Sequence, residues 1–413
     1  MSPEGPPMSR SASRSNATPP ADHRLPAEGG PGRAGATELE PHVAPEPPAP
    51  PLAPQPSAGL AGLAVTALGF VVLGILPGGP QTALETVGPI ATFALPVLGV
   101  SALWWEGWPA RRLRQPLAGL ANLALIVAGG IVLTLVAQAV VGRIDMGGVF
   151  SIPAEGATTF PTWPWTMPLG VLAFVAFLQI TFVNGRWPLA GLDGRVAGAA
   201  VLVAAWAIAL VVYVLIVNWN FVPPQAREAI GLGNPGGPES GLDLLGWLAC
   251  VTAFQVLFYI ALGGWPTVRI RGAAARLVAA NALTIGGGWL TWLVLFHGLN
   301  VTTPTIAAMS AGVAAAAVIS AILFDNWPAG PRPGLVAAQV ALVTAALFYG
   351  LRALGDGIET WNRDPVELWV TVSCLNFIAA TAIAHVAVFH RWPIPPADAP
   401  STGPPAMVDN SRT

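Results

Sequence analysis

The chain contains no lysine, only two cysteines and few charged residues. All 19 of its basic residues are arginine, which excludes a Walker A nucleotide-binding loop because that loop needs lysine. Cys250 and Cys374 both lie in long apolar runs, which excludes a disulfide scaffold and a cysteine-rich metal or iron–sulfur site. Charged residues make up 10% of the chain, against about 25% in a soluble domain. With 54% hydrophobic residues, this composition predicts an integral membrane protein.

Other patterns that would indicate a function are also missing. The formal net charge is -2 and no block of arginines forms a basic patch, so we expect no nucleic-acid partner. The five histidines show no metal-binding spacing, and we therefore expect no metal site and no cofactor. No set of acid, base and nucleophile stands out, so we assign no catalytic residue and do not expect an enzyme.

The two ends of the chain are rich in proline, serine and glycine and lack apolar periodicity. Residues 1–57 and 394–413 therefore cannot bury enough apolar surface to offset the entropy of ordering, and we predict two disordered tails. The polytopic membrane domain is predicted between them, over residues 58–393. The absence of lysine, together with the excess of alanine, glycine and proline, is typical of a high-GC genome and suggests a bacterial plasma membrane.

The membrane domain consists of apolar runs of about 20 residues, the length that a helix needs to cross the hydrocarbon core. Because the runs are continuous rather than alternating, they predict helices and not barrel strands. We predict an all-α integral membrane protein with about ten transmembrane helices. They lie near residues 58–77, 86–105, 117–141, 168–184, 196–217, 242–263, 275–298, 305–324, 334–354 and 366–389.

The orientation follows from the arginines that flank the runs. Leaving out distant positions in the tails, ten lie on the side shared by both tails, and four lie opposite: Arg143, Arg227, Arg352 and Arg363. Because loops rich in arginine stay on the cytoplasmic side, both termini are predicted to be cytoplasmic. No charge lies near the middle of a run, which argues against a carrier that depends on a buried carboxylate.

A Trp-Pro pair follows every second run. This spacing predicts five tandem two-helix repeats, with hairpins near residues 58–109, 117–188, 196–266, 275–328 and 334–393. Tryptophan favours the headgroup interface and proline cannot continue a helix, so each pair is interpreted as an interface anchor and a helix stop. The alternative is a cytoplasmic docking surface formed by the five corners. The anchor residues are Trp108, Trp187, Trp265, Trp327 and Trp392.

Uncharged polar residues near the midplane are the candidate binding groups. Their ordinary role is a hydrogen bond between helices, and the alternative is that several line one cavity. The seventh run adds three glycines, which indicate either close helix packing or a broken helix at a ligand site. The predicted substrate-binding residues are Gln255, Asn281, Thr284, Gly286, Gly287, Gly288, Trp289 and Asn376.

Two functions from different classes are consistent with this sequence. The first is a permease-like transporter or channel in the lipid bilayer for an uncharged or zwitterionic small molecule or a lipid. The second is a non-catalytic scaffold that recruits protein partners through its cytoplasmic corners and tails. A polar cavity at mid-depth favours transport, whereas a dry core favours the scaffold.

Overall fold

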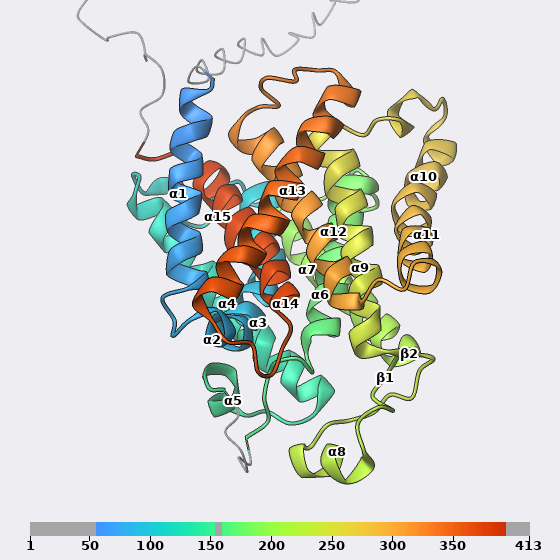
Figure 1. Ribbon diagram of the computed structural model, residues 1–413. Coiled ribbons are helices and arrows are strands. Elements are labelled where there is room, and N and C mark those ends of the chain that lie inside the picture. The colour runs from blue at the N-terminus through green and yellow to red at the C-terminus, as the bar shows by residue number, and fades with distance from the viewer. Residues whose placement is uncertain (1–54, 153–158, 394–413) are drawn as a thin grey trace, which may run out of the picture. The chain divides into compact units, whose positions relative to one another are not determined.

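The computed structural model describes residues 55–152 and 159–393 (Figure 1). The predicted tail 394–413, and all but the last three residues of the predicted tail 1–57, lie outside the described residues. Most of the described part is helical, and its only strands are two residues long each. Within these residues, nine helices are at least 18 residues long and apolar enough to cross a membrane. Each of them matches one of the predicted runs, which confirms the predicted helices and supports a multi-pass membrane protein.

The fourth predicted run forms a shorter helix, in which 12 α-helical residues are followed by a five-residue π-helical turn. This span, Met167–Val183, falls just short of the nine others in length. It begins at Met167 because Pro168 occupies the first helical turn, where its missing N–H is not needed.

Five spans form a closed inner ring. The span of α3 packs against α6, α6 against α9, α9 against α12, and α12 against α14. The ring is closed by contacts between α3 and Ser373–Ala379, the π-helical segment that follows α14. These inner spans are Pro80–Trp104 with α2 (Pro80–Thr82) and α3 (Gly88–Gly99), Met167–Val183 with α6 (Met167–Leu178), Gly241–Ala261 with α9 (Gly241–Val256), Thr303–Leu323 with α12 (Thr303–Val318), and Val366–Val388 with α14 (Val366–Val372) and α15 (Ala380–Ile383).

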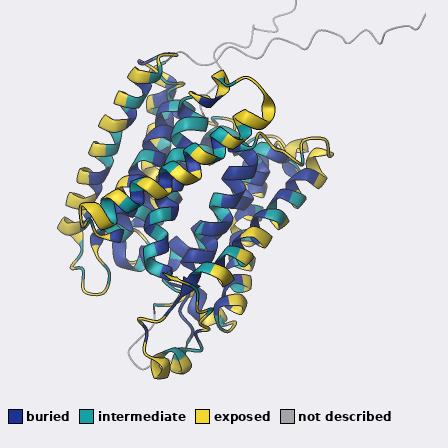
Figure 2. Ribbon diagram, turned by 90° about the vertical axis from the view of Figure 1, so that its right-hand side faces the viewer, coloured by how far each residue is buried: buried dark blue, intermediate teal, exposed yellow. Residues whose placement is uncertain are grey.

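The other five spans lie outside this ring. In the four long inner spans, 56% to 78% of the most apolar window is buried, against only 22% to 33% in the outer spans. Figure 2 shows this difference as dark blue inner helices beside helices with yellow faces. The outer faces therefore meet lipid. The outer spans are α1 (Ser57–Gly74), α4 (Leu117–Val141), α7 (Gly194–Ile216), Ala273–Gly298 with α10 (Ala273–Asn281) and α11 (Gly287–Leu293), and α13 (Pro333–Ile358).

Short elements collect at one end of the bundle, the lower end in Figure 1. They lie in the two long loops after α4 and α7. A two-residue parallel pairing joins β1 to β2, with Val217 opposite Glu239. The Trp219 side chain is completely buried beneath this loop and donates to the Tyr213 hydroxyl at 3.1 Å. The elements are α5 (Met146–Phe150), β1 (Val217–Asn218), α8 (Pro224–Ile230) and β2 (Glu239–Ser240).

The five Trp-Pro corners share one backbone conformation. Each inner span ends in a π-helical turn, then two residues with positive φ, then a cis Trp-Pro bond. In each corner the tryptophan N–H donates to the carbonyl three residues earlier, so carbonyls at the helix end gain partners. The two residues of each left-handed pair are Glu106 and Gly107, Gly185 and Arg186, Gly263 and Gly264, Asp325 and Asn326, and His390 and Arg391.

This conformation changes the interpretation of the corner. The sequence pattern predicts that proline stops the helix, but the helix has already ended at the left-handed pair. Glycine, asparagine and aspartate adopt this conformation at the lowest cost, which explains their frequency in the two positions before tryptophan. Two short 3₁₀ turns, Ala110–Arg112 and Thr267–Arg269, follow the first and third corners.

Candidate functional site

Five polar side chains form a hydrogen-bonded network where α6 and α9 meet the α10–α11 span. Gln255 Nε2 donates to Gln179 Oε1 at 2.6 Å, and Gln179 Nε2 donates to Asn281 Oδ1 at 2.9 Å. The Thr284 hydroxyl donates to Gln179 Oε1 at 3.3 Å, and Asn281 Nδ2 donates to Asn184 Oδ1 at 2.9 Å. We call this group the amide network. Its side chains join three spans.

Gln179, Gln255 and Thr284 are buried, Asn184 and Asn281 are half-buried, and one atom of the network has no partner in the described part of the chain. Gln255 is 1% exposed and Thr284 is completely buried. Gln255 uses its Nε2 twice, towards Gln179 and the Val175 carbonyl, but its Oε1 accepts no hydrogen bond within the described residues. A buried acceptor without a donor costs free energy, so this oxygen is available to a solute or a water molecule.

Local helix geometry positions these side chains. Gln179 opens the π-helical turn Gln179–Val183, and Thr284 lies in a second π-helical turn, Ala282–Gly286. π-Helical turns insert one extra residue into the helical repeat and are frequent at functional sites. Here the two turns lie on facing helices at the same level, as the hydrogen bond between Gln179 and Thr284 shows.

Three of the predicted binding residues, Gln255, Asn281 and Thr284, therefore meet in the amide network. The sequence could not show that Gln179 connects them. Asn184 was missed, because it follows the last apolar residue of its run and resembles a loop residue. The sequence signal that could have identified Asn184 is its spacing from Gln179, because the two amides stand at the two ends of one helical turn.

The predicted glycines have separate environments. A Cβ on Gly288 would lie 2.8 Å from Val251 Cα, and one on Gly287 would lie 2.6 Å from Phe254, so both allow close packing against α9. Gly286 faces open space, and the span continues as a helix through all three positions. Trp289 is 48% exposed and does not join the network.

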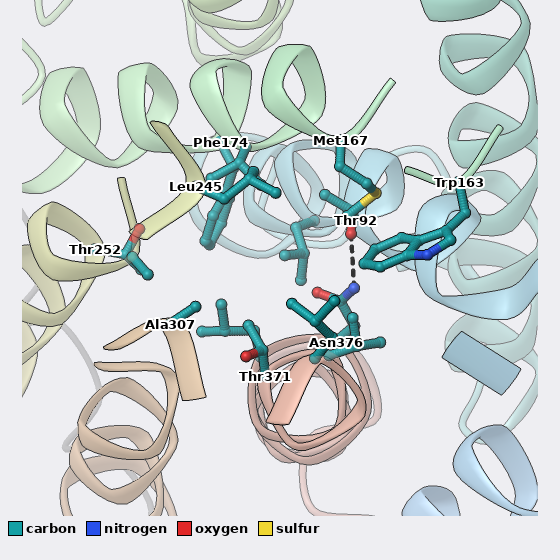
Figure 3. A pocket seen from close by; sticks show the side chains of 15 residues that line it. Thr92, Trp163, Met167, Phe174, Leu245, Thr252, Ala307, Thr371 and Asn376 are labelled. Atoms are coloured by element: carbon teal, nitrogen blue, oxygen red, sulfur yellow. Dashed lines mark hydrogen bonds between the residues drawn. The ribbon is translucent and has the colours of Figure 1, made fainter. Parts of the chain in front are cut away.

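Asn376 lies apart from the amide network, on the wall of a cavity inside the inner ring. Its Nδ2 donates to Thr92 Oγ1 at 2.7 Å and to the Gly88 carbonyl at 2.9 Å (Figure 3). All five inner spans line this axial cavity, whose volume is about 50 Å³. Its lining is Thr92, Leu95, Trp163, Met167, Val171, Phe174, Leu245, Ala249, Thr252, Ala307, Leu368, Thr371, Val372, Leu375 and Asn376.

The axial cavity is apolar with a few acceptors. The hydroxyls of Thr92, Thr252 and Thr371 each donate to the carbonyl four residues earlier. Their oxygens can therefore accept from a solute, while their hydrogens are occupied. The cavity suits a solute with an apolar body and few donors.

A second, open cleft of about 690 Å³ lies at the Trp-Pro end, between the α6 and α9 spans and α10. Asn184 of the amide network lines it, together with Tyr259, Trp187 and Arg276. The Tyr259 hydroxyl is 2.9 Å from Thr267 Oγ1, which fixes one wall. We call it the inner cleft. It leaves one end of the amide network, at Asn184, open to solvent.

A charged cluster lies at the opposite end of the bundle. Glu85 is 6% exposed, and its Oε1 lies 2.9 Å from Arg363 Nη2. Trp163, which lines the axial cavity, donates from Nε1 to Asp364 Oδ2 at 3.1 Å. Burial raises the pKa of Asp364 above its usual value, and the hydrogen bond from Trp163 opposes this shift. Glu85 lies before residue 86, where the apolar run begins, although the helical span begins at Pro80; the apolar pattern therefore does not include it.

No group of three histidine, cysteine, aspartate or glutamate side chains within residues 55–152 and 159–393 is arranged to hold a metal ion. The chain matches no protein-family model, no curated protein and no solved structure.

Proposed function

We propose that this chain is a permease-like transporter or channel for small uncharged or zwitterionic solutes. The observation that carries the proposal is the order of sites along two neighbouring helices. On the α6 span, Phe174 lines the axial cavity, Gln179 lies in the amide network, and Asn184 lines the inner cleft. On the α9 span the same order is Thr252, Gln255 and Tyr259.

This order describes a path with a constriction. A solute in the axial cavity would pass between α6 and α9 where Gln255 and Gln179 now bond to each other, and would then reach the inner cleft. Amides can exchange their mutual hydrogen bonds for bonds to a solute at little net cost, because each amide both donates and accepts. An isolated ion would find no counter-charge in the network, which favours solutes without net charge.

We further propose that the ten spans are five repeated hairpins, with the Trp-Pro corners on the cytoplasmic side of a bacterial plasma membrane. The common corner conformation supports repetition, and the distribution of arginine supports the orientation. Trp187, Trp327 and Trp392 are 62%, 45% and 47% exposed, as interface anchors need to be. Their exposure is also compatible with a docking surface for a protein partner.

Solute flux into liposomes that contain the purified full chain tests the transport proposal. The solutes are glycerol, urea, glycine and leucine, and swelling is followed by light scattering. We expect entry of at least one solute above the rate of empty liposomes, and about tenfold slower entry for Gln179→Leu and Gln255→Leu. Gln339→Leu is the matched control, because Gln339 bonds the Trp327 carbonyl away from the path.

Two results would contradict the proposal. One is wild-type flux no faster than that of empty liposomes for every solute. The other is an equal loss of flux in Gln339→Leu, which would attribute the effect to general damage. In the first case the exposed corners become the functional surfaces, as in a scaffold.

A further inference from the structure

The ion pair between Glu85 and Arg363 is the most unusual electrostatic feature of the described residues. The Glu85 side chain is 4% exposed within a membrane span, whereas the Arg363 side chain is 45% exposed in the loop between α13 and α14. Gln81 Nε2 donates to the same carboxylate oxygen at 3.2 Å. A buried carboxylate is costly unless it keeps a counter-charge, so Glu85 needs a cationic partner. Because Arg363 is half exposed, that partner can be exchanged.

This ion pair lies next to the axial cavity. α14, which provides Leu368 and Val372 to the cavity wall, packs against the π-helical turn Ala83–Val87 that carries Glu85. One turn further along, the Gly88 carbonyl accepts from Asn376 on the cavity wall. On the other side of the ion pair, Asp364 follows Arg363 in the loop and accepts from Trp163 at the cavity.

The charges at this position define the class of solute. An anion that bound Arg363 would leave Glu85 buried without a partner, and a cation that bound Glu85 would take from Arg363 the carboxylate that it pairs with. A zwitterion can replace the internal ion pair with two new ones, so that every charge stays compensated. Asp364 adds a second carboxylate near Arg363, because a hydrogen bond from the neutral Trp163 N–H does not neutralise it. A zwitterion nevertheless leaves the net charge of the whole group unchanged.

We propose that Glu85 and Arg363 bind a zwitterion of the α-amino acid type, whose ammonium group bonds Glu85 and whose carboxylate bonds Arg363. An apolar side chain enters the axial cavity. The cavity volume of about 50 Å³ corresponds to roughly three or four water-sized groups, which matches a branched aliphatic side chain. This inference rests on the proposed transport path, because it makes the axial cavity part of a route for solutes.

Binding to the full chain in lipid nanodiscs tests the site without any need for flux. The probes are leucine, leucine amide as the cation, and N-acetylleucine as the anion, each measured by calorimetry. Leucine should bind, and both ions should bind at least about tenfold more weakly. Glu85→Gln and Arg363→Gln should each weaken leucine binding by about tenfold or more.

Two further variants separate binding from folding. Arg352→Gln is the matched control, because Arg352 is an arginine of the same end, 46% exposed and 3.3 Å from Glu367. It should bind leucine as the wild type does. The double exchange Glu85→Arg with Arg363→Glu keeps one charge of each sign, and it should restore binding that the single variants lose.

The proposal is overturned if leucine does not bind, if either ion binds as tightly as leucine, or if Arg352→Gln loses as much affinity as Arg363→Gln. These outcomes are separate from those of the flux experiment. Leucine binding without flux of any solute would support the zwitterion site and contradict the transport proposal. Flux of glycerol or urea without leucine binding would keep transport and overturn the zwitterion site.

Discussion

Gln255 donates to Gln179 at 2.6 Å, and this contact joins α9 to α6 at the level that separates the axial cavity from the inner cleft. The donor has a second acceptor in the Val175 carbonyl, so α9 is held to α6 by two bonds from one nitrogen. Solute passage along this seam therefore requires both bonds to open or to be replaced.

The two glutamines should be energetically coupled. Either Gln179→Leu or Gln255→Leu alone leaves buried amide groups without partners, at a cost of about 1–3 kcal/mol in the free energy of unfolding. The double variant removes both partners and should cost less than the sum of the single variants. A double-mutant cycle from unfolding in detergent measures this coupling. Additive losses would contradict a direct interaction.

The three glycines of the seventh span should respond differently to substitution. Gly288→Val should lower the free energy of unfolding by about 1–3 kcal/mol, because its Cβ would lie 2.8 Å from the Val251 backbone. Gly286→Ala is the control. It faces open space in a helix and should be neutral or stabilising by about 0.5–1 kcal/mol. Equal losses in both variants would contradict the packing described for Gly288.

The corner conformation predicts the effect of substitutions at His390, whose φ is 51°. His390→Gly should stabilise the fold by up to about 1 kcal/mol, because glycine adopts the left-handed conformation without steric cost. His390→Val should destabilise it by about 1–2 kcal/mol, because a β-branched residue resists this φ. Thermal unfolding of the two variants in parallel measures the difference, and the reverse order would refute the assignment.

The stability of the protein should depend on pH through Asp145, which lies outside the membrane spans. The backbone N–H of Phe160 donates to its carboxylate at 2.8 Å and that of Gly148 at 3.1 Å, and these bonds hold the pKa of Asp145 below its usual value. Because the folded pKa is the lower one, the stabilisation is complete above the unfolded pKa and is lost as the pH falls through the folded pKa.

Unfolding of the wild type and Asp145→Ala between pH 2 and pH 6 tests this dependence, since the usual aspartate pKa is about 3.9. Asp145→Ala should be less stable than the wild type at pH 6 by about 1 kcal/mol, because α5 loses its N-cap. The difference should shrink towards pH 2. A constant difference across the range would show that the charge of Asp145 contributes nothing.

The sequence predicted the spans well because a run of about 20 apolar residues has few alternatives to a membrane helix. The ring arrangement could not be predicted, because runs such as 117–141 and 305–324 are equally apolar although one lies outside and the other inside. The two runs differ in how small residues are distributed around the helix. In α12, Ala308, Ala315 and Ala316 are completely buried, and such small residues let neighbouring helices surround it.

The candidate site was predicted in part. The midplane residues Gln255 and Thr284 both bond to Gln179, as does Asn281 of the seventh run. Asn376, chosen for the same depth as Gln255 and Thr284, belongs to the axial cavity instead. The depth of a residue in the membrane follows from counting along its helix. Which neighbouring helix its side chain faces depends on how the helices pack. Glu85 was missed for a different reason, because polar residues within the first turns of a helix disguise where that helix begins.

The axial cavity is enclosed by five segments that are far apart in the sequence and chemically different. Asn376 and Thr92 lie on one part of its wall, while Phe174 and Leu245 provide aromatic and aliphatic surface elsewhere (Figure 3). A pore made of five identical subunits has the same wall on every side and cannot distinguish how a solute is turned about the axis. In this single chain no two sides of the wall are alike, so a solute in the cavity should be held in one orientation about the axis.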